Sequence, residues 1–279
     1  MSIGSFILIL NESPWIAPHI LRVLPFIDDM VFYDGGSSDG TLEIIKEIQE
    51  CEPDGHKVRV FKAKNPEDLK DDYVRLFNQC MHELRTDLAW FLHPDMWVVN
   101  PEKILDIKSS NAIAASVKMK SFAGNPGGDL YEIAGRNKTW KNIHRLRNPD
   151  LGAHYHGWYG AWDEDVYYSE VTAGDHTLYM DTADYPYEVV ESGIEVCHYG
   201  DVRDYDRRFR RMKTCLVNQG RTPEDADKVA LEHPRVTLRS GLDPIGNRIE
   251  LVPAQYPAKF LEAKAKYAHL ERAKEPACA

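Results

Sequence analysis

Glycine, serine and aspartate residues gather in the segment Asp34 to Thr41, which reads DGGSSDGT. The segment follows an apolar run and precedes helical periodicity, so it is expected to join the carboxyl end of a strand to the amino end of a helix. Glycines let the backbone approach a ligand closely, and a helix amino terminus attracts anionic groups. A tight turn with a helix cap explains the same residues equally well. Neither the dinucleotide-binding GxGxxG pattern nor the phosphate-binding GxxxxGK[ST] pattern fits this segment.

A second candidate is Asp95, which comes two residues after His93 at the end of the apolar run 88–92. A carboxylate at a strand end, together with oxygens of a bound diphosphate and of water, suits a hard divalent cation such as Mg²⁺ or Mn²⁺. A strand-terminal aspartate is also a common cap of a turn or helix. In an extended segment His93 and Asp95 point to the same side, so the histidine is either a second ligand or a packed neutral side chain.

The central part of the chain combines histidines, aromatic residues and acids. Among its histidines, His198 is the best placed to meet phosphate or metal, because it follows a short apolar run and precedes a basic segment. The stretch WYGAWDED ends in Asp163, Glu164 and Asp165. Aromatic faces stack on sugar rings, and a carboxylate can deprotonate an acceptor hydroxyl. A solvated acidic turn flanked by core aromatic residues is the alternative interpretation.

Alternating strand-like and helix-like segments must position these residues. Continuous apolar or alternating runs predict strands at 6–10, 30–33, 58–61 and 88–92. Helical spacing and capping residues predict helices at 13–24, 42–48 and 67–84. These crossings predict a parallel, right-handed α/β sheet, whose ligands bind at the carboxyl ends of the strands.

After Asn100 the pattern is less regular. A helix at 102–108 and a strand at 112–119 are predicted, and an irregular region follows up to residue 187. A basic helix is predicted at 205–216. From Pro223 the chain is expected to form short helices joined by proline-containing turns, ending in a charged helix near 258–274.

Composition excludes several classes of protein. The 279 residues are 43% hydrophobic and 28% charged, which excludes disorder along the whole chain. The 44 acidic residues against 34 basic ones give a formal net charge of −10, so neither nucleic acid nor an anionic membrane is the expected main partner. Five widely spaced cysteines without a CxxC pair indicate a reducing cytoplasm. The early apolar run 6–10 is too short for a signal peptide or a transmembrane segment, and neither is expected.

In their order along the chain, these segments resemble the family 2 glycosyltransferases. The matching pieces are Asn11-Glu12 after the first strand, the segment Phe32 to Thr41, and Asp95. The second piece is the most specific, because it is close to the family's second-strand signature throughout its length. The segments 144–148 and 198–200 resemble the branch that contains lipopolysaccharide-core and peptide glucosyltransferases. The resemblance covers about residues 3 to 215.

The resemblance implies the GT-A fold, an α/β fold with a Rossmann-like, mostly parallel sheet flanked by helices. It divides the chain into a GT-A domain at 1–220 and a helical C-terminal extension at 221–279. Within the domain, the half that binds a nucleotide sugar is expected at about 1–100 and the acceptor half at about 101–220.

The resemblance also assigns roles to the candidate residues. In the family, the residues corresponding to Glu12 and Asp34 hold the nucleoside, and a DxD-type motif holds a divalent cation on the diphosphate. The expected residues of the nucleotide-sugar site are Asn11, Glu12, Asp34, Gly35, Arg75 and His93. The expected ligands of Mn²⁺ or Mg²⁺ are Asp95 and His198, and the expected catalytic base is Asp163 or Glu164.

Two of these assignments have a competing interpretation. Arg75 is equally explained as a solvated arginine on a helix. His93 stands where the DxD motif usually has its first acid, so Asp95 is the one carboxylate that the motif supplies. This departure weakens the expected dependence on a metal.

The expected function is that of an inverting hexosyltransferase. It would move a sugar from a nucleoside-diphosphate sugar, with a UDP-sugar favoured, to a hydroxyl of a glycan, lipid-linked or peptide acceptor. The alternative is a non-catalytic protein that binds a nucleotide sugar or glycan through a degenerate GT-A site, and His93 favours it. Intact Asp34, Asp95 and His198 favour the enzyme.

Overall fold

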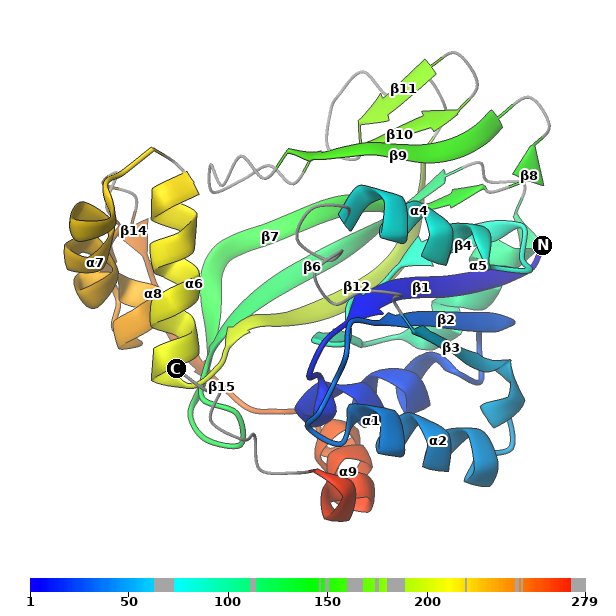
Figure 1. The fold of residues 1–279 in the computed structure, drawn as a ribbon, viewed down its shortest axis with the longest axis horizontal. Helices are drawn as coiled ribbons and strands as arrows, with labels where there is room; N and C mark the ends of the chain where they lie inside the picture. Colours follow the sequence, from blue (N-terminus) through cyan, green and yellow to red (C-terminus); the bar gives the residue numbers. More distant parts are fainter. Residues whose placement is uncertain are drawn as a thin grey trace.

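The computed structural model describes residues 1–62, 73–110, 114–145, 147–148, 151–159, 168–173, 176–179, 189–218, 220–243, 246 and 248–271. Its largest element is a central sheet with the strand order β3-β2-β1-β4-β7-β6-β12-β5, to which β15 adds by pairing with β7 (Figure 1). The strands are β1 Ile3–Ile9, β2 Asp29–Asp34, β3 Val58–Lys62, β4 Leu88–Phe91, β5 Met96–Val98, β6 Ala114–Gly124, β7 Leu130–Arg145, β12 Val189–Val202 and β15 Leu251–Ala254.

The N-terminal half of the sheet is parallel. Strands β3, β2, β1 and β4 pair side by side in the same direction, and Ile9 at the end of β1 lies opposite Asp34 at the end of β2. Every residue of β1 is buried, which explains why its apolar run is continuous rather than alternating. The carboxyl ends of these strands therefore meet at one edge, as predicted.

Helices cover both faces of this parallel part. The helices α1 (Ser13–Val23) and α2 (Thr41–Cys51) lie on one face, and α4 (Tyr73–His82) lies on the other (Figure 1). The buried side chains of α2 are Thr41, Ile44, Ile45 and Ile48, which recur at helical spacing. The predicted α/β fold, with parallel strands flanked by helices, is confirmed.

The second half of the sheet changes direction at β7. This strand pairs antiparallel with β4 and with β6, and β12 then pairs parallel with β6 and antiparallel with β5. The region that the sequence analysis describes as irregular therefore contains long strands. The strand β7 forms a hairpin with β6, but it also pairs with β4, which lies about 50 residues earlier, so short-range patterns do not indicate its place in the sheet.

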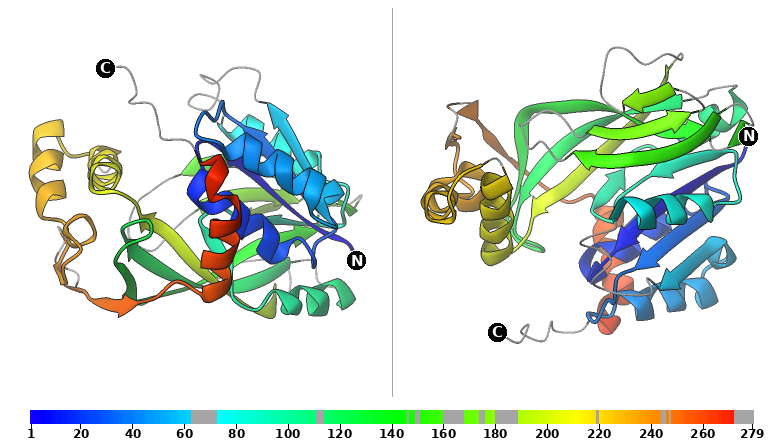
Figure 2. Two further views of the ribbon diagram at one scale, coloured as in Figure 1. Left: turned by 90° about the horizontal axis from the view of Figure 1, so that it is seen from below. Right: turned by 45° about the horizontal axis from the view of Figure 1, so that its top comes forward.

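A second, smaller sheet lies beside α4 (Figure 2). Its strand order is β11-β10-β9-β8, and α4 contacts β9. The strands are β8 Arg147–Asn148, β9 Leu151–Tyr159, β10 Tyr168–Ala173 and β11 His176–Tyr179.

The remaining helices follow β5 and β12. The helix α5 (Ile104–Ser109) comes near its predicted position, and α6 (Tyr205–Asn218) matches the predicted basic helix. The helices α7 (Pro223–Glu232) and α8 (Pro234–Thr237) pack beside α6, away from α1 and α2 (Figure 1). No helix among the described residues has the length and apolar character needed to span a membrane.

The C-terminal segment returns to the N-terminal half. After the short strands β13 (Gly241–Leu242) and β14 (Arg248–Ile249), β15 joins the central sheet, and α9 (Ala258–Tyr267) packs against α1 (Figure 2). Phe260 of α9 is buried with Trp15 of α1. The described part of the segment after residue 220 thus contains the helices α7, α8 and α9 and also the strands β13, β14 and β15. A separate helical extension with its boundary at residue 220 stays a prediction.

Candidate functional site

The loops after β1 and β2 are joined to each other by hydrogen bonds. The Asn11 N–H donates to Ser37 Oγ at 2.9 Å, and the Ser38 N–H donates to Asn11 Oδ1 at 2.9 Å. The Glu12 N–H donates to Thr41 Oγ1 at 2.8 Å. Asn11 has a φ of +56°, a left-handed conformation that asparagine adopts more readily than most residues. These bonds hold the two loops together at the carboxyl edge of the sheet.

Asp39 fixes the same two loops from inside. Its carboxylate accepts the N–H groups of Ser13 and Thr41, both at 3.1 Å, and the Thr41 hydroxyl at 2.5 Å. Burial alone would raise the pKa of Asp39, but the hydrogen bonds from Thr41 and Ser13 outweigh it and lower this pKa. Asp39 was not predicted to have a role of its own, although it lies inside the DGGSSDGT segment.

Asp34 and Gly35 shape the turn after β2. The buried Asp34 carboxylate accepts the N–H groups of Gly36 at 3.0 Å and Ser37 at 3.1 Å. Gly36 has a φ of +99°, which favours glycine, and the Gly35 N–H extends the β1 ladder by donating to Ile9 O at 2.9 Å. Asp34 therefore organises the loop backbone, and its expected contact with a nucleoside stays a prediction.

Asp95 and His198 come together at the carboxyl edge. Asp95 lies between β4 and β5, and its Oδ1 is 3.6 Å from His198 Nε2 on β12. The Tyr199 N–H donates to Asp95 O at 2.8 Å, so the pairing of β5 with β12 brings the two side chains to one place. The sequence analysis named both residues as metal ligands without being able to predict their distance.

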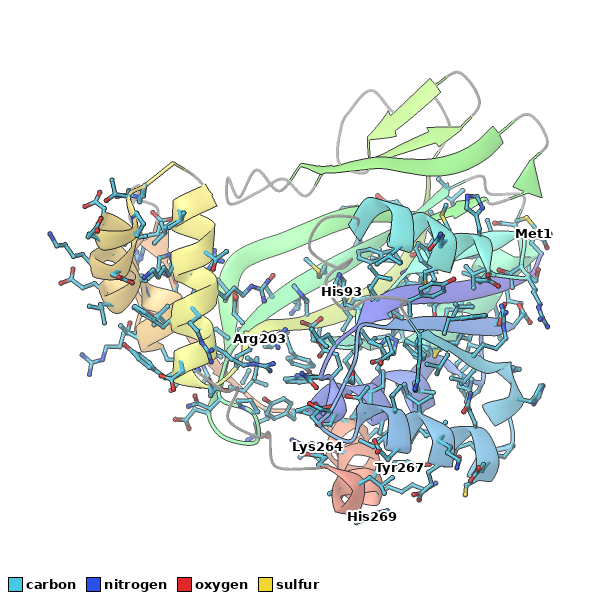
Figure 3. All side chains as sticks on the ribbon, in the orientation of Figure 1. Met1, His93, Arg203, Lys264, Tyr267 and His269 are labelled. Carbon is cyan, nitrogen blue, oxygen red and sulfur yellow. The ribbon has the colours of Figure 1, made fainter. Side chains whose placement is uncertain are left out.

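Arg203, just after β12, completes this group. Its Nη2 donates to Asp95 Oδ2 at 3.2 Å, and the side chains of Arg203 and Asp95 are 17% and 8% exposed. Figure 3 shows Arg203 and His93 between α6 and β1. The sequence analysis did not identify Arg203, and the only signal is that it begins the basic segment that follows His198.

The charges around Asp95 keep it ionised. Burial would raise the pKa of Asp95, but the charge of Arg203, and that of His198 and His93 when these are protonated at low pH, outweighs burial and lowers it. Burial lowers the pKa of His198 against the opposing charge of Asp95, and burial lowers the pKa of His93 to about 4. At neutral pH the site therefore presents a carboxylate beside neutral imidazoles, which are the protonation states that bind metals.

The residues at Asp95 fit a divalent cation that brings further ligands with it. Asp95 Oδ1 is buried and has no hydrogen-bond partner among the described residues. No group of three or more His, Cys, Asp or Glu side chains within the described ranges could hold a metal. Mg²⁺ and similar ions are commonly held by one or two carboxylates, waters and the phosphates of a substrate. Asp95 and His198 would hold such an ion together with a diphosphate.

Glu12 faces the same group from the β1 loop. Its Oε2 is buried without a hydrogen-bond partner in the described part of the chain. Burial raises the pKa of Glu12 to about 7, Arg203 and Arg207 oppose this, and the nearby Asp95 adds to it. The structure thus brings Glu12, His93, Asp95 and His198 together.

The absence of a side chain at Gly200 leaves the space that the His198 imidazole occupies. A methyl group at Gly200 would lie 2.6 Å from both Cε1 and Nε2 of the His198 imidazole. The next side chain, Tyr199, stacks on Trp15 with ring centroids 5.6 Å apart and packs against Phe260 at 5.5 Å. The helices α1 and α9 therefore support β12 directly beside His198.

Four candidate side chains lie outside what the structure describes. Asp163 and Glu164, together with Asp165, fall in the segment 160–167, outside the described residues. Arg75 lies on α4, but its side chain is also outside the described part. Their roles stay predictions.

No protein-family model matches the sequence, and no curated protein matches it either. Among solved structures, residues 1–349 of S. aureus TarS are similar at 13% identity and a TM-score of 0.43, covering 82% of this chain and 69% of that one. The same protein in complex with UDP gives 15% identity and a TM-score of 0.41, over 83% and 70%. Glucosyl-3-phosphoglycerate synthase from Mycobacterium tuberculosis with Mn²⁺ and UDP-glucose gives 18% identity and 0.31, over 43% of each chain.

Proposed function

We propose that this protein is a GT-A-type glycosyltransferase that transfers a sugar from a nucleoside-diphosphate sugar, with a UDP-sugar favoured, to an acceptor hydroxyl. One observation carries the proposal. Asp95 Oδ1 is buried without a hydrogen-bond partner among the described residues and faces His198 Nε2 at 3.6 Å. This pair lies beside two fixed loops at the carboxyl ends of parallel strands, where α/β proteins bind nucleotides.

The two loops suit the nucleoside end of the donor. Asn11, Gly35 and the Asp34 turn form a backbone surface held by hydrogen bonds between the loops. The Glu12 carboxylate keeps one acceptor oxygen open, which suits a sugar hydroxyl. In this proposal His93 and Arg75 line the diphosphate side of the donor.

Asp95 and His198 would hold Mn²⁺ or Mg²⁺ on the diphosphate. When bound, such an ion offsets the negative charge that develops on the leaving diphosphate. The ionised state of Asp95 and the neutral state of His198 support this role.

The acceptor half of the proposal rests on the sequence. Asp163 or Glu164 would accept the proton of the acceptor hydroxyl, with inversion at the anomeric carbon and a hexose as the transferred sugar. A glycan, lipid-linked molecule or peptide is the proposed acceptor. We also propose a cytoplasmic location, because the five cysteines are widely spaced and form no CxxC pair.

A second candidate function is that of a non-catalytic nucleotide-sugar or glycan-binding protein. It is favoured by His93, which replaces an acid in the motif and has a pKa of about 4, so it brings no charge of its own at neutral pH. Such a protein would use the same loops and would differ in releasing its ligand unchanged.

Thermal unfolding with UDP, GDP, dTDP and CMP, each with and without Mn²⁺, tests the proposal. One nucleoside diphosphate should stabilise the protein in a Mn²⁺-dependent way, by about 2.7 kcal/mol at a hundred times its dissociation constant. Asp95→Ala should abolish the Mn²⁺-dependent part, while Asp106→Ala, at an exposed residue of α5, should not. Failure of every nucleotide to stabilise the wild type would show the proposed function to be wrong. Binding without transfer to any acceptor would support the second candidate.

A further inference from the structure

Arg203 is held in a fixed position at the end of β12. Its N–H donates to Gly124 O at 3.0 Å, and its carbonyl accepts a hydrogen bond from the Arg208 guanidinium. Its Nε donates to Gly200 O at 3.0 Å. Because both the backbone and the start of the guanidinium are bound, the remaining N–H groups of Arg203 point in a set direction, toward Asp95.

The charge of this guanidinium acts on two acidic side chains. Arg203 Nη2 donates to Asp95 Oδ2 at 3.2 Å. Arg203 is also the charged group that most strongly opposes the rise in the pKa of Glu12, while Asp95 adds to that rise. Arg203 is therefore the cation shared by two acids that repel each other.

A divalent cation and Arg203 are competitors for the charge of Asp95. The guanidinium already neutralises one oxygen of the carboxylate, and a cation on the other oxygen would be repelled by it at short range. An anion placed between them removes this repulsion. A diphosphate has the required chemistry, because its oxygens bind a divalent cation and also accept the paired N–H groups of an arginine.

We infer that Arg203 is a ligand-binding residue with two partners: it neutralises Asp95 in the ligand-free protein and donates to the phosphates when a nucleoside diphosphate binds with its metal. This inference rests on the proposed function, because it takes a nucleoside diphosphate as the ligand. In the ligand-free protein Arg203 opposes binding of the metal alone. With the diphosphate present it favours binding of both, so the metal and the diphosphate bind cooperatively.

The variant Arg203→Gln separates the effect of Arg203 on binding of the metal alone from its effect on binding of the diphosphate with the metal. Binding of Mn²⁺ alone is measured by the electron paramagnetic resonance signal of the free ion, and binding of UDP and of inorganic pyrophosphate by calorimetry with and without Mn²⁺. The variant should bind Mn²⁺ alone about fivefold or more tightly than the wild type, and should bind UDP and pyrophosphate with Mn²⁺ about fivefold or more weakly. Pyrophosphate shows that the loss concerns the phosphates rather than the nucleoside.

Two further variants complete the experiment. Arg210→Gln is the matched control, because Arg210 is an exposed arginine of α6 whose Nε donates to Asp206 O, and it should change neither affinity. Arg203→Lys keeps the charge but loses the paired donors, so it should bind Mn²⁺ alone like the wild type and UDP more weakly. It also keeps the inference testable if Arg203→Gln does not fold.

The outcomes distinguish the possible roles of Arg203. A structural role alone would weaken both Mn²⁺ and UDP binding in Arg203→Gln, and this result would overturn the inference. Unchanged affinity for Mn²⁺ alone would overturn it as well, because the competition for Asp95 would be absent. If the wild type binds UDP with Mn²⁺ in either case, the proposed function survives. Failure of the wild type to bind UDP with Mn²⁺ overturns both.

Discussion

Glu12→Gln should make the ligand-free protein more stable than the wild type at pH 8 and equally stable at acid pH. Burial raises the pKa of Glu12 to about 7 from an ordinary value of 4.5. The folded protein therefore holds this proton more tightly than the unfolded chain does. The stability that Glu12 contributes is fully present below pH 4.5 and is lost as the pH rises through 7. A glutamine side chain stays neutral at every pH, so the Glu12→Gln variant keeps this stability as the pH rises.

The expected size follows from that pKa and from the surroundings of Glu12. A change from 4.5 to about 7 corresponds to about 3 kcal/mol for a carboxyl group wholly removed from water. As a residue, however, Glu12 is only partly buried, so water screens part of this effect. We therefore expect Glu12→Gln to gain about 1–2 kcal/mol over the wild type at pH 8.

Urea unfolding at pH 5, 6, 7 and 8, without nucleotide and with a chelator, measures this difference. Glu262→Gln is the control, because Glu262 is exposed on α9, and its stability should follow the wild type at every pH. Curves of stability against pH that run parallel for Glu12→Gln and the wild type would refute the reasoning. A lower stability of Glu12→Gln at pH 8 would refute it more directly, because it would mean that the charge of Glu12 stabilises the fold.

Three other substitutions test the residues that hold the loops, His198 and α9 in place. Asp39→Ala leaves three buried donors without their acceptor and should lower the free energy of unfolding by about 2–4 kcal/mol in urea; a loss below about 0.5 kcal/mol would contradict its role in joining the loops. Gly200→Ala should displace the His198 imidazole and weaken Mn²⁺-dependent UDP binding about tenfold in calorimetry, and wild-type affinity would show that His198 is not a ligand. Phe260→Ala should cost about 3–5 kcal/mol in thermal unfolding, whereas Leu261→Ala, on the exposed side of α9, should cost under about 1 kcal/mol; equal losses would contradict the packing of α9 on α1.

The parallel half of the fold was predictable from local patterns. The strands β1 and β4 are buried along their whole length, so their apolar runs are visible without knowledge of their neighbours. The strand β12 was not predictable in the same way. It contains Glu191, Gly193 and Glu195 at exposed positions, and its partners β5 and β6 lie far away in the chain.

The same difference separates the predicted and the missed residues of the site. Asp95 and Glu12 follow strands that the sequence indicates, so their common edge could be predicted. Arg203 could not be, because the sequence shows it only as one of several arginines, and its contact with Asp95 exists only after β12 has paired with β5. Asp39 was hidden for a different reason: its partners Ser13 and Thr41 are ordinary helix-start residues until the two loops meet.

The place of β12 in the sheet sets the order in which the site can form during synthesis. The strand lies between β6 and β5, yet it begins at Val189, long after β5 has ended at Val98. A nascent chain that stops before Val189 already has β3, β2, β1 and β4 with the loops that follow β1 and β2, but it lacks His198 and Arg203. Until β12 arrives, the facing edges of β5 and β6 have no strand between them, and such edges pair readily with other chains. Long-range closure of this kind is slow, so formation of the Asp95–His198 pair and protection of these edges come from the same late folding step.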